Sequence, residues 1–305
     1  MNRKLKWLSG LVLSGSLLTA HATPDAGWIN NFDEGAPDNY TLTRGDKTMS
    51  VAFLKVLKVG DKIAVKGQQT IDLRLRGGTT PLVAITTANS PFQVDNANQV
   101  PNEFGESWTW IKTHLDKWRK LTQSVPKDDS TDLQIPLLKK VKAPLVLVAG
   151  KRALALQWYG GTPPYQVTVK RGRNRLQSTS TQKTAIKTKV INFEANKSYR
   201  VVVEDAQEQR FSKKFKVVSK APSYPEVLQN VPNDIRAVLR ATWLIYEEKG
   251  QWILEAYQQL DTSQPAKKLK TALIRGMGKR AYPGKQGRGP SPQVDVEVAN
   301  DGMQY

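Results

Sequence analysis

Two apolar runs separated by a turn make up residues 154–169, which read LALQWYGGTPPYQVTV and decide the fold class. The second run alternates apolar and polar residues, as in a strand with one buried face, and the glycines and prolines before it favour a reversal of the chain. Further apolar runs recur at roughly 8 to 15 residues, a spacing typical of a β-sandwich. They cover residues 145–148, 185–191, 199–203 and 211–218. We therefore expect a β-sandwich over residues 136–220.

The same stretch resembles the W-x-GG-x-P-P-Y-x-V-x-V segment of bacterial immunoglobulin-like repeats, and residues 198–206 resemble their later Y-x-V-x-V-x-D strand. The resemblance covers about residues 143–219 and implies a non-enzymatic adhesion, spacer or binding module. Because the chain contains no cysteine, Trp158 should pack in a core without an intersheet disulfide. Tyr199 should either form a corner hydrogen bond or pack in that core.

A smaller antiparallel β-domain is predicted over residues 23–104, opening with an extended polar arm at residues 23–38. In Ile71–Arg76 every second residue is apolar, and Gly77-Gly78 follows as a turn. Residues 50–95, with the Gly60-Asp61 turn and this hairpin, resemble the periplasmic β-domain of FecR-type signal-relay proteins. That resemblance implies a sensory or relay role through protein contacts.

Residues 105–123 change from the period of a strand to that of a helix, within a connector predicted to span residues 105–135. One stripe of this helix holds Trp108, Ile111, Leu115 and Trp118. A basic helix with tryptophan on its apolar face can bind a membrane surface or a partner protein. The alternative is that the tryptophans pack on the preceding β-domain.

The carboxyl-terminal part is predicted as a helical hairpin over residues 221–275, with a helix from Asn233 to about Lys249, a second from Gln251 to Leu260 and a third from Pro265 to Ile274. Residues 276–305, rich in Gly and Pro, are predicted to be disordered. The expected fold class is mainly β with a smaller α part.

The amino terminus has the three parts of a secretory signal peptide, namely Arg3, Lys4 and Lys6, an apolar run, and Ala20-His21-Ala22. Cleavage after residue 22 predicts a periplasmic or secreted protein without a transmembrane helix. The remaining chain has one histidine, His114, so thiolate and multi-histidine metal sites are excluded and no cofactor is expected.

The net charge of +19 is concentrated between residues 111 and 220, with 24 Lys and Arg against 8 Asp and Glu. Such a field favours an anionic partner, an envelope polymer or an envelope protein, although lysines also protect sheet edges. Nucleic acid is disfavoured because no groove-reading motif or aromatic platform accompanies the charge. The candidate anion-binding surface consists of Lys170, Arg171, Arg173, Arg175, Lys187, Lys189, Lys214 and Lys216.

An enzymatic role has little support in the motifs. Ser124–Lys127 and Ser180–Lys183 match S-x-x-K, the acylation pair of penicillin-recognising enzymes, but neither is followed by K-T-G. We therefore expect a non-catalytic envelope protein that binds or bridges anionic components. The alternatives are a FecR-like sensor or accessory subunit of a signalling or secretion system, and a hydrolase.

Overall fold

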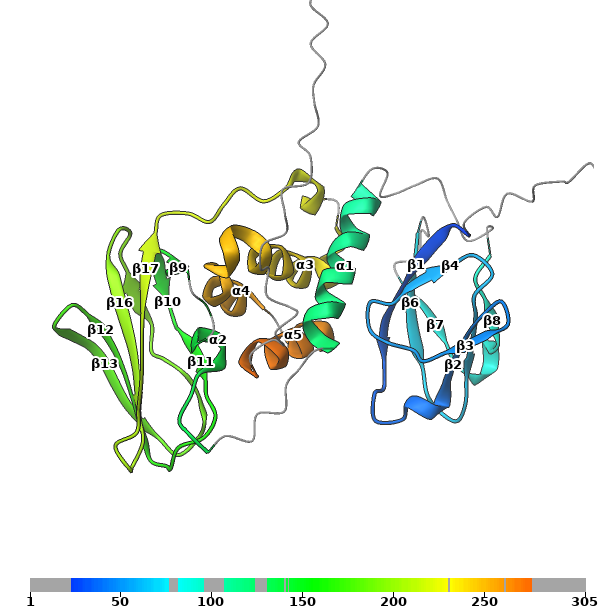
Figure 1. Ribbon diagram of the computed structural model, residues 1–305. Coiled ribbons are helices and arrows are strands. Elements are labelled where there is room, and N and C mark those ends of the chain that lie inside the picture. The colour runs from blue at the N-terminus through cyan, green and yellow to red at the C-terminus, as the bar shows by residue number, and fades with distance from the viewer. Residues whose placement is uncertain are drawn as a thin grey trace, which may run out of the picture. The chain divides into compact units, whose positions relative to one another are not determined.

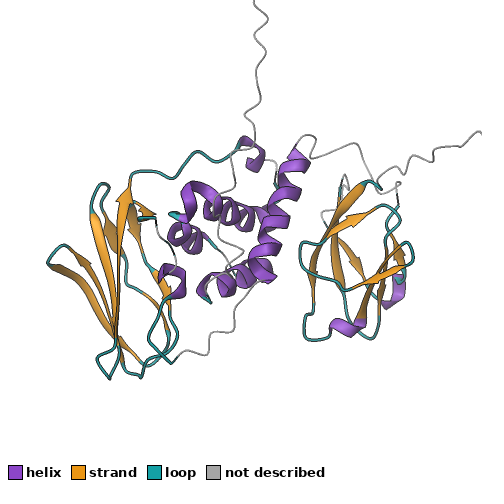
Figure 2. Cartoon of the chain, viewed as in Figure 1, coloured by secondary structure: helices purple, strands orange, loops and turns teal. Residues whose placement is uncertain are grey.

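The computed structural model describes residues 23–76, 82–95, 107–123, 131–139, 141, 143–229, 231–260 and 262–275. The predicted signal peptide and the predicted disordered tail lie outside the described residues. The fold is mainly β with a smaller helical part, as expected (Figure 2). The chain divides into two compact units, the first made of residues 1–51 and 56–99 and the second of residues 52–55 and 100–305. The predicted connector helix, sandwich region and helical region therefore belong to a single unit.

The first unit contains two four-stranded antiparallel sheets, of strand order β4-β1-β6-β7 and β3-β2-β5-β8. In β6, Ile71, Leu73 and Leu75 are buried, whereas the residues between them are half-buried, so the alternation in sequence produces one core-facing side. The strands are β1 (Asp25–Phe32), β2 (Tyr40–Arg44), β3 (Lys47–Met49), β4 (Val56–Lys58), β5 (Lys62–Val65), β6 (Ile71–Leu75), β7 (Val83–Ile85) and β8 (Phe92–Gln93).

The expected extended arm at residues 23–38 is wrong, because this segment contains β1, which pairs with both β4 and β6. Trp28 and Ile29 are fully buried at adjacent positions of this strand. Register shifts between Asp25 and Gly27 and between Ile29 and Asn31 interrupt the pairing. Such bulges break the two-residue period, so the apolar pattern of an inner strand does not appear in the sequence.

Gly27 allows β1 and β6 to approach closely. Its φ is +151°, and a Cβ there would lie 2.0 Å from the carbonyl oxygen of Arg74. We expect Gly27→Ala to lower the free energy of unfolding of the first unit by about 2 kcal/mol, because the backbone of β6 must shift. Hydrogen exchange of the amides in β6 measures this change within the first unit.

Gly45→Ala is the matched control. Gly45 also has a positive φ, +56°, but a Cβ there meets nothing within 4 Å. Its expected cost is only the left-handed backbone penalty of about 1 kcal/mol. Equal losses in the two variants would contradict a steric role for Gly27.

The second unit is built on a five-stranded sheet of order β13-β12-β16-β17-β9, in which only the β17–β9 pair is parallel. Two short two-stranded sheets, β10–β15 and β11–β14, complete the β-structure of this unit. Figure 1 shows β10 and β11 beside the larger sheet. The strands are β9 (Leu145–Val148), β10 (Gly150–Arg152), β11 (Ala155–Gln157), β12 (Tyr165–Arg171), β13 (Asn174–Thr181), β14 (Ala185–Lys187), β15 (Ile191–Phe193), β16 (Ser198–Glu204) and β17 (Arg210–Val218).

Aromatic side chains fill the space between these sheets. Trp158 is fully buried and meets the ring of Tyr165 edge-on, at 5.3 Å between centroids. Phe193 of β15 lies 5.1 Å from the ring of Tyr199, which stacks on Phe215 of β17. The hydroxyl of Tyr199 also accepts a hydrogen bond of 2.8 Å from the backbone N–H of Glu194. Tyr199 therefore both forms a hydrogen bond with the backbone and packs in the core, the two alternatives predicted for it.

Five helices are described, α1 (Ser107–Gln123), α2 (Pro136–Lys139), α3 (Asn233–Tyr246), α4 (Ile253–Gln259) and α5 (Gln264–Ile274). Helix α3 packs against α1, α4 and α5, and α4 packs against β9. Helix α3 ends at Tyr246, earlier than the expected Lys249, because Glu248 and Lys249 have φ values of 43° and 61°. Among the described residues, no helix combines the length and apolarity needed to cross a membrane.

Candidate functional site

Four basic side chains lie opposite one another across four adjacent strands of the five-stranded sheet. The register pairs Arg175 of β13 with Lys170 of β12, Lys170 with Arg200 of β16, and Arg200 with Lys214 of β17. Directly opposed residues share a face of the sheet, with Cβ atoms about 5 Å apart. We call this set Arg175, Lys170, Arg200 and Lys214 the cationic row. Its strands stand side by side in Figure 1.

The cationic row is open to solvent. Arg175, Arg200 and Lys214 are exposed and Lys170 is half-buried. The neighbouring residues of the same strands, Val169, Val201 and Phe215, are buried on the opposite face of the sheet. The core therefore orients the four cations outward. Lys216, two residues beyond Lys214 and likewise exposed, extends the charge along β17.

Electrostatic repulsion in the cationic row is not relieved by ion pairs. Within the described part of the chain, the ion pairs found involve other basic residues, and none includes a member of the row. Arg200 donates a hydrogen bond of 3.0 Å to the hydroxyl of Ser212, which is neutral. Like charges at directly opposed positions destabilise a sheet. An anion placed over the row would remove this repulsion.

The structure separates the other predicted cations from the row. Arg171 is ion-paired with Glu194, and this hydrogen bond raises the pKa of the guanidinium group. Arg173 lies in the turn between β12 and β13. Lys187 belongs to β14, in a different sheet, and Lys189 is exposed beyond the end of that strand. Of the eight predicted residues, the outward face of the five-stranded sheet thus brings together Lys170, Arg175, Lys214 and Lys216.

Arg200 was missed by the sequence reasoning, which grouped cations by clusters along the chain. It is an isolated basic residue within the apolar run of β16, where Tyr199 and Val201 are buried on either side. An exposed position inside an alternating strand is the signal that identifies it. Its neighbours in the row come from other strands and lie far away in sequence.

The apolar stripe of α1 is covered by the chain itself. Trp108, Ile111, Leu115 and Trp118 are at most 7% exposed, and α1 packs against α3 and α5. The indole Nε1 of Trp118 donates a hydrogen bond of 3.2 Å to the carbonyl of Pro265. The stripe therefore faces other helices of the second unit and is buried against them.

Of the two S-x-x-K motifs, Ser124–Lys127 lies outside the described residues. Ser180 and Lys183 are both exposed at the end of β13. No group of three or more His, Cys, Asp or Glu side chains suited to holding a metal ion occurs among the residues that the structure describes.

A comparison of the chain with protein-family models finds no match, and a comparison with curated proteins finds none either. The candidate site therefore stands on its geometry and charge.

Proposed function

We propose that this chain is a non-catalytic exported envelope protein that binds anionic envelope polymers through the outer face of its five-stranded sheet. The observation that carries the proposal is the cationic row, four basic residues in register on four neighbouring strands without an ion-pair partner among the described residues. Adjacent strands lie about 4.8 Å apart, so the row presents its charges over about 14 Å. A polymer with repeated phosphate or carboxylate groups matches such spacing.

The basic residues differ in what they offer to an anion. Arg175 and Arg200 provide planar guanidinium groups that can bind phosphate or carboxylate through two hydrogen bonds, whereas Lys170 and Lys214 act as point charges. The strands that carry them are fixed by the aromatic core beneath, which keeps the charges in place before binding. We take the second unit to contain an immunoglobulin-like module, in keeping with its resemblance to those repeats and with the buried Trp158.

Co-sedimentation with cell-wall sacculi and with anionic vesicles at rising salt concentration tests the proposal. The variant Lys170→Gln, Arg175→Gln, Arg200→Gln, Lys214→Gln removes the cationic row. At roughly 0.5 kcal/mol for each surface ion pair, the four changes should weaken binding by about thirtyfold and make its salt dependence shallower. Both effects follow from the loss of charge neutralisation on a polyanion.

A control variant removes the same number of charges elsewhere. Lys47, Lys62, Lys66 and Lys267 are exposed lysines outside the five-stranded sheet, and all four are changed to Gln. This variant should bind nearly as well as the original chain. If both variants bind equally weakly, the binding depends on net charge and not on the cationic row. If the original chain does not bind at low salt, the proposal is overturned and the search turns to protein partners.

A further inference from the structure

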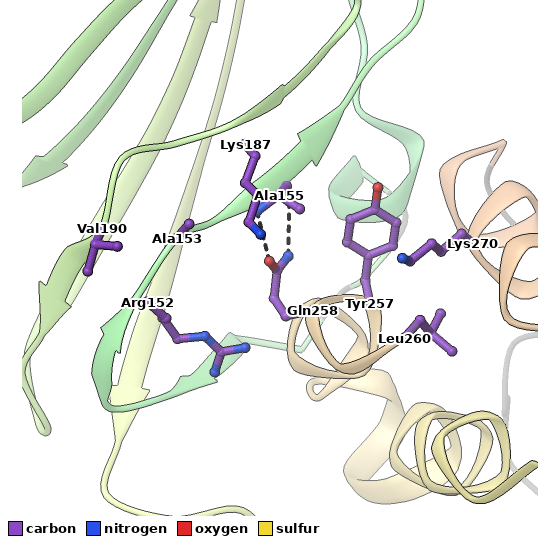
Figure 3. A pocket seen from close by; sticks show the side chains of 9 residues that line it. All are labelled: Arg152, Ala153, Ala155, Lys187, Val190, Tyr257, Gln258, Leu260 and Lys270. Atoms are coloured by element: carbon purple, nitrogen blue, oxygen red, sulfur yellow. Dashed lines mark hydrogen bonds between the residues drawn. The ribbon is translucent and has the colours of Figure 1, made fainter. Parts of the chain in front are cut away.

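The two ends of the five-stranded sheet differ in what covers their backbone groups. At one end, the N–H of Val148 of β9 donates a hydrogen bond of 3.0 Å to the carboxylate of Glu255 on α4. Helix α4 also covers β11, because the side-chain amide of Gln258 accepts from the N–H of Ala155 at 2.8 Å and donates to its carbonyl at 2.9 Å (Figure 3). Helix α4 thus occupies two strand edges that another strand could otherwise join.

Strand β13 forms the opposite end of the five-stranded sheet (Figure 1). Within the described part of the chain it pairs with β12 alone. It is eight residues long, and none of them is buried. Residues 177–181, which read QSTST, contain neither charge nor proline, two features that commonly protect a sheet edge. The N–H and C=O groups on the side of β13 away from β12 therefore form an open edge, to which an extended segment can bind.

A stretch of residues 276–305, outside the described part of the chain, has the sequence pattern of a strand. Residues 294–298 read VDVEV and alternate β-branched apolar residues with carboxylates. The Gly- and Pro-rich residues 276–293 before them can span up to about 60 Å, at roughly 3.3 Å per residue. This reach exceeds the diameter of about 40 Å expected for a compact unit of residues 100–275. The stretch can therefore reach β13 of its own chain.

We propose that residues 294–298 of the same chain join β13 as a further strand and cover its open edge. On its core side, β13 carries Thr179, which lies opposite the buried Val167 of β12. The three valines, placed on this side, would extend the apolar layer beneath the sheet and leave water. Because successive side chains point to opposite faces, both carboxylates then lie on the outer face, which carries the cationic row.

Electrostatics favours the same orientation. Arg175 is the member of the cationic row that β13 contributes, and it is exposed. No ion pair of Arg175 occurs among the described residues. Asp295 and Glu297 on the added strand would lie within reach of its guanidinium group, since opposed side chains are about 5 Å apart and diagonal ones about 7 to 8 Å. Attachment to the same chain favours this segment over one from a second copy, because a flexible linker gives a millimolar effective concentration.

Hydrogen exchange in the full chain tests the added strand. The first variant is Val294→Asn, Val296→Asn, Val298→Asn. In this variant the β13 amides that point away from β12 should exchange about tenfold faster than in the original chain, because water then reaches them. The matched control changes three apolar residues nearer to α5 and should keep the slow exchange; it is Met277→Asn, Ala281→Asn, Tyr282→Asn. Equal exchange in the original chain and the first variant would overturn the proposal, as would equal acceleration in both variants.

Engineered disulfides test the orientation of the segment, because the chain has no cysteine of its own. Thr179→Cys is combined in turn with each core-side change, Val294→Cys, Val296→Cys or Val298→Cys. At least one of these pairs should crosslink within one chain, whereas Thr179→Cys with Asp295→Cys should not. A disulfide needs Cα atoms about 4.4 to 6.8 Å apart and Cβ atoms that point toward each other. Equal crosslinking with Asp295→Cys, or crosslinks between chains alone, would overturn the proposal.

A docked segment would also regulate polymer binding, a consequence that rests on the proposed function. Asp295 and Glu297 compete with an anionic polymer for Arg175, so Asp295→Asn with Glu297→Gln should strengthen binding to sacculi by about fivefold. Asp46→Asn with Glu226→Gln changes the net charge equally at exposed positions and should have a smaller effect. Equal effects would contradict the competition. No polymer binding by the original chain would overturn the proposed function and leave the exchange and crosslinking results as they are.

Discussion

Replacing Glu255 by Ala is expected to lower the free energy of unfolding of the second unit by about 4 kcal/mol. Glu255 is 2% exposed on α4, and its carboxylate accepts hydrogen bonds from Arg152 of β10 and from the backbone N–H of Val148 of β9. The distances are 3.0 to 3.1 Å. Removing one partner of a buried ion pair costs about 3–5 kcal/mol, and the guanidinium of Arg152, whose side chain is 24% exposed, would keep a largely desolvated charge without its partner.

The effect should exceed that of an ordinary surface pair because Glu255 connects three elements. The amide of Gln259, one turn further along α4, donates a further hydrogen bond of 3.0 Å to the same carboxylate. After truncation to Ala, the N–H of Val148 and the guanidinium of Arg152 both lose their acceptor. Hydrogen exchange of the amides in β16, the central strand of the five-stranded sheet, measures the change in global stability of the unit.

Two further variants separate charge from packing. Glu255→Gln keeps the volume and should cost about half as much as Glu255→Ala, since the amide oxygen still accepts hydrogen bonds. Asp116→Ala removes the partially exposed partner of Arg119 on α1 and should cost less than about 1 kcal/mol. Equal losses in the free energy of unfolding for Glu255→Ala and Asp116→Ala would contradict a role for Glu255 in holding α4 against β9 and β10.

The sequence predicted the elements whose burial is periodic. The apolar runs anticipated β12, β16 and β17, whose core-facing residues recur at every second position, as Val167 and Val169, Val201 and Val203, and Phe215 and Val217 do. Thr168 and Val202, between such residues, are buried as well. Helix α5 was also anticipated, with Pro265 in its first turn and an end at Ile274. The bulged strand β1 was missed, because Trp28 and Ile29 are buried at consecutive positions and give no two-residue period.

The sequence predicted a surface of positively charged residues. Which of these residues lie together became known only from the pairing of the strands in the structure. Lys187 and Lys214 belong to similar alternating patterns, yet β14 and β17 lie in different sheets. Arg200 joins Lys170 and Lys214 because its strand lies between theirs. The burial of Glu255 was not predicted from the sequence either, because a glutamate in a helix is ordinarily a solvent-facing residue.

Lowering the pH from about 7 to about 5 is expected to destabilise the second unit by about 2 kcal/mol through His114, rising to about 3 kcal/mol near pH 4. His114 is 4% exposed on α1, and burial is the main cause that lowers its pKa from 6.5 to about 4. The nearby Lys117 lowers it further, whereas the hydrogen bond with the carbonyl of Trp110 acts in the opposite direction.

The contacts of the ring define which nitrogen holds the proton. Nδ1 lies 2.9 Å from the carbonyl oxygen of Trp110, which can only accept, so Nδ1 carries the hydrogen. Nε2, 3.4 Å from Nζ of Lys117, is then the acceptor. The ring also stacks on the indole of Trp110 at 3.8 Å between centroids. Protonating Nε2 would remove this acceptor and place a second positive charge beside Lys117.

The direction of the pH effect follows from proton binding in the two states. Below pH 6.5 the unfolded chain protonates His114, whereas the folded chain resists until about pH 4. The unfolded state therefore binds more protons in this window, and stability falls as the pH falls. Well above pH 6.5 His114 is neutral in both the folded and the unfolded state, and it no longer makes the stability depend on pH.

The variant His114→Gln isolates this contribution, because Gln is polar and does not titrate. Hydrogen exchange of the β16 amides at pH 7 and pH 5 gives the stability of both chains under the same conditions. The variant should lose most of the difference of about 2 kcal/mol between these pH values, although it lowers stability at pH 7 by disturbing the stack on Trp110. An unchanged pH dependence in the variant would assign the effect to carboxylates, and α1 would then hold His114 without any penalty for its protonation.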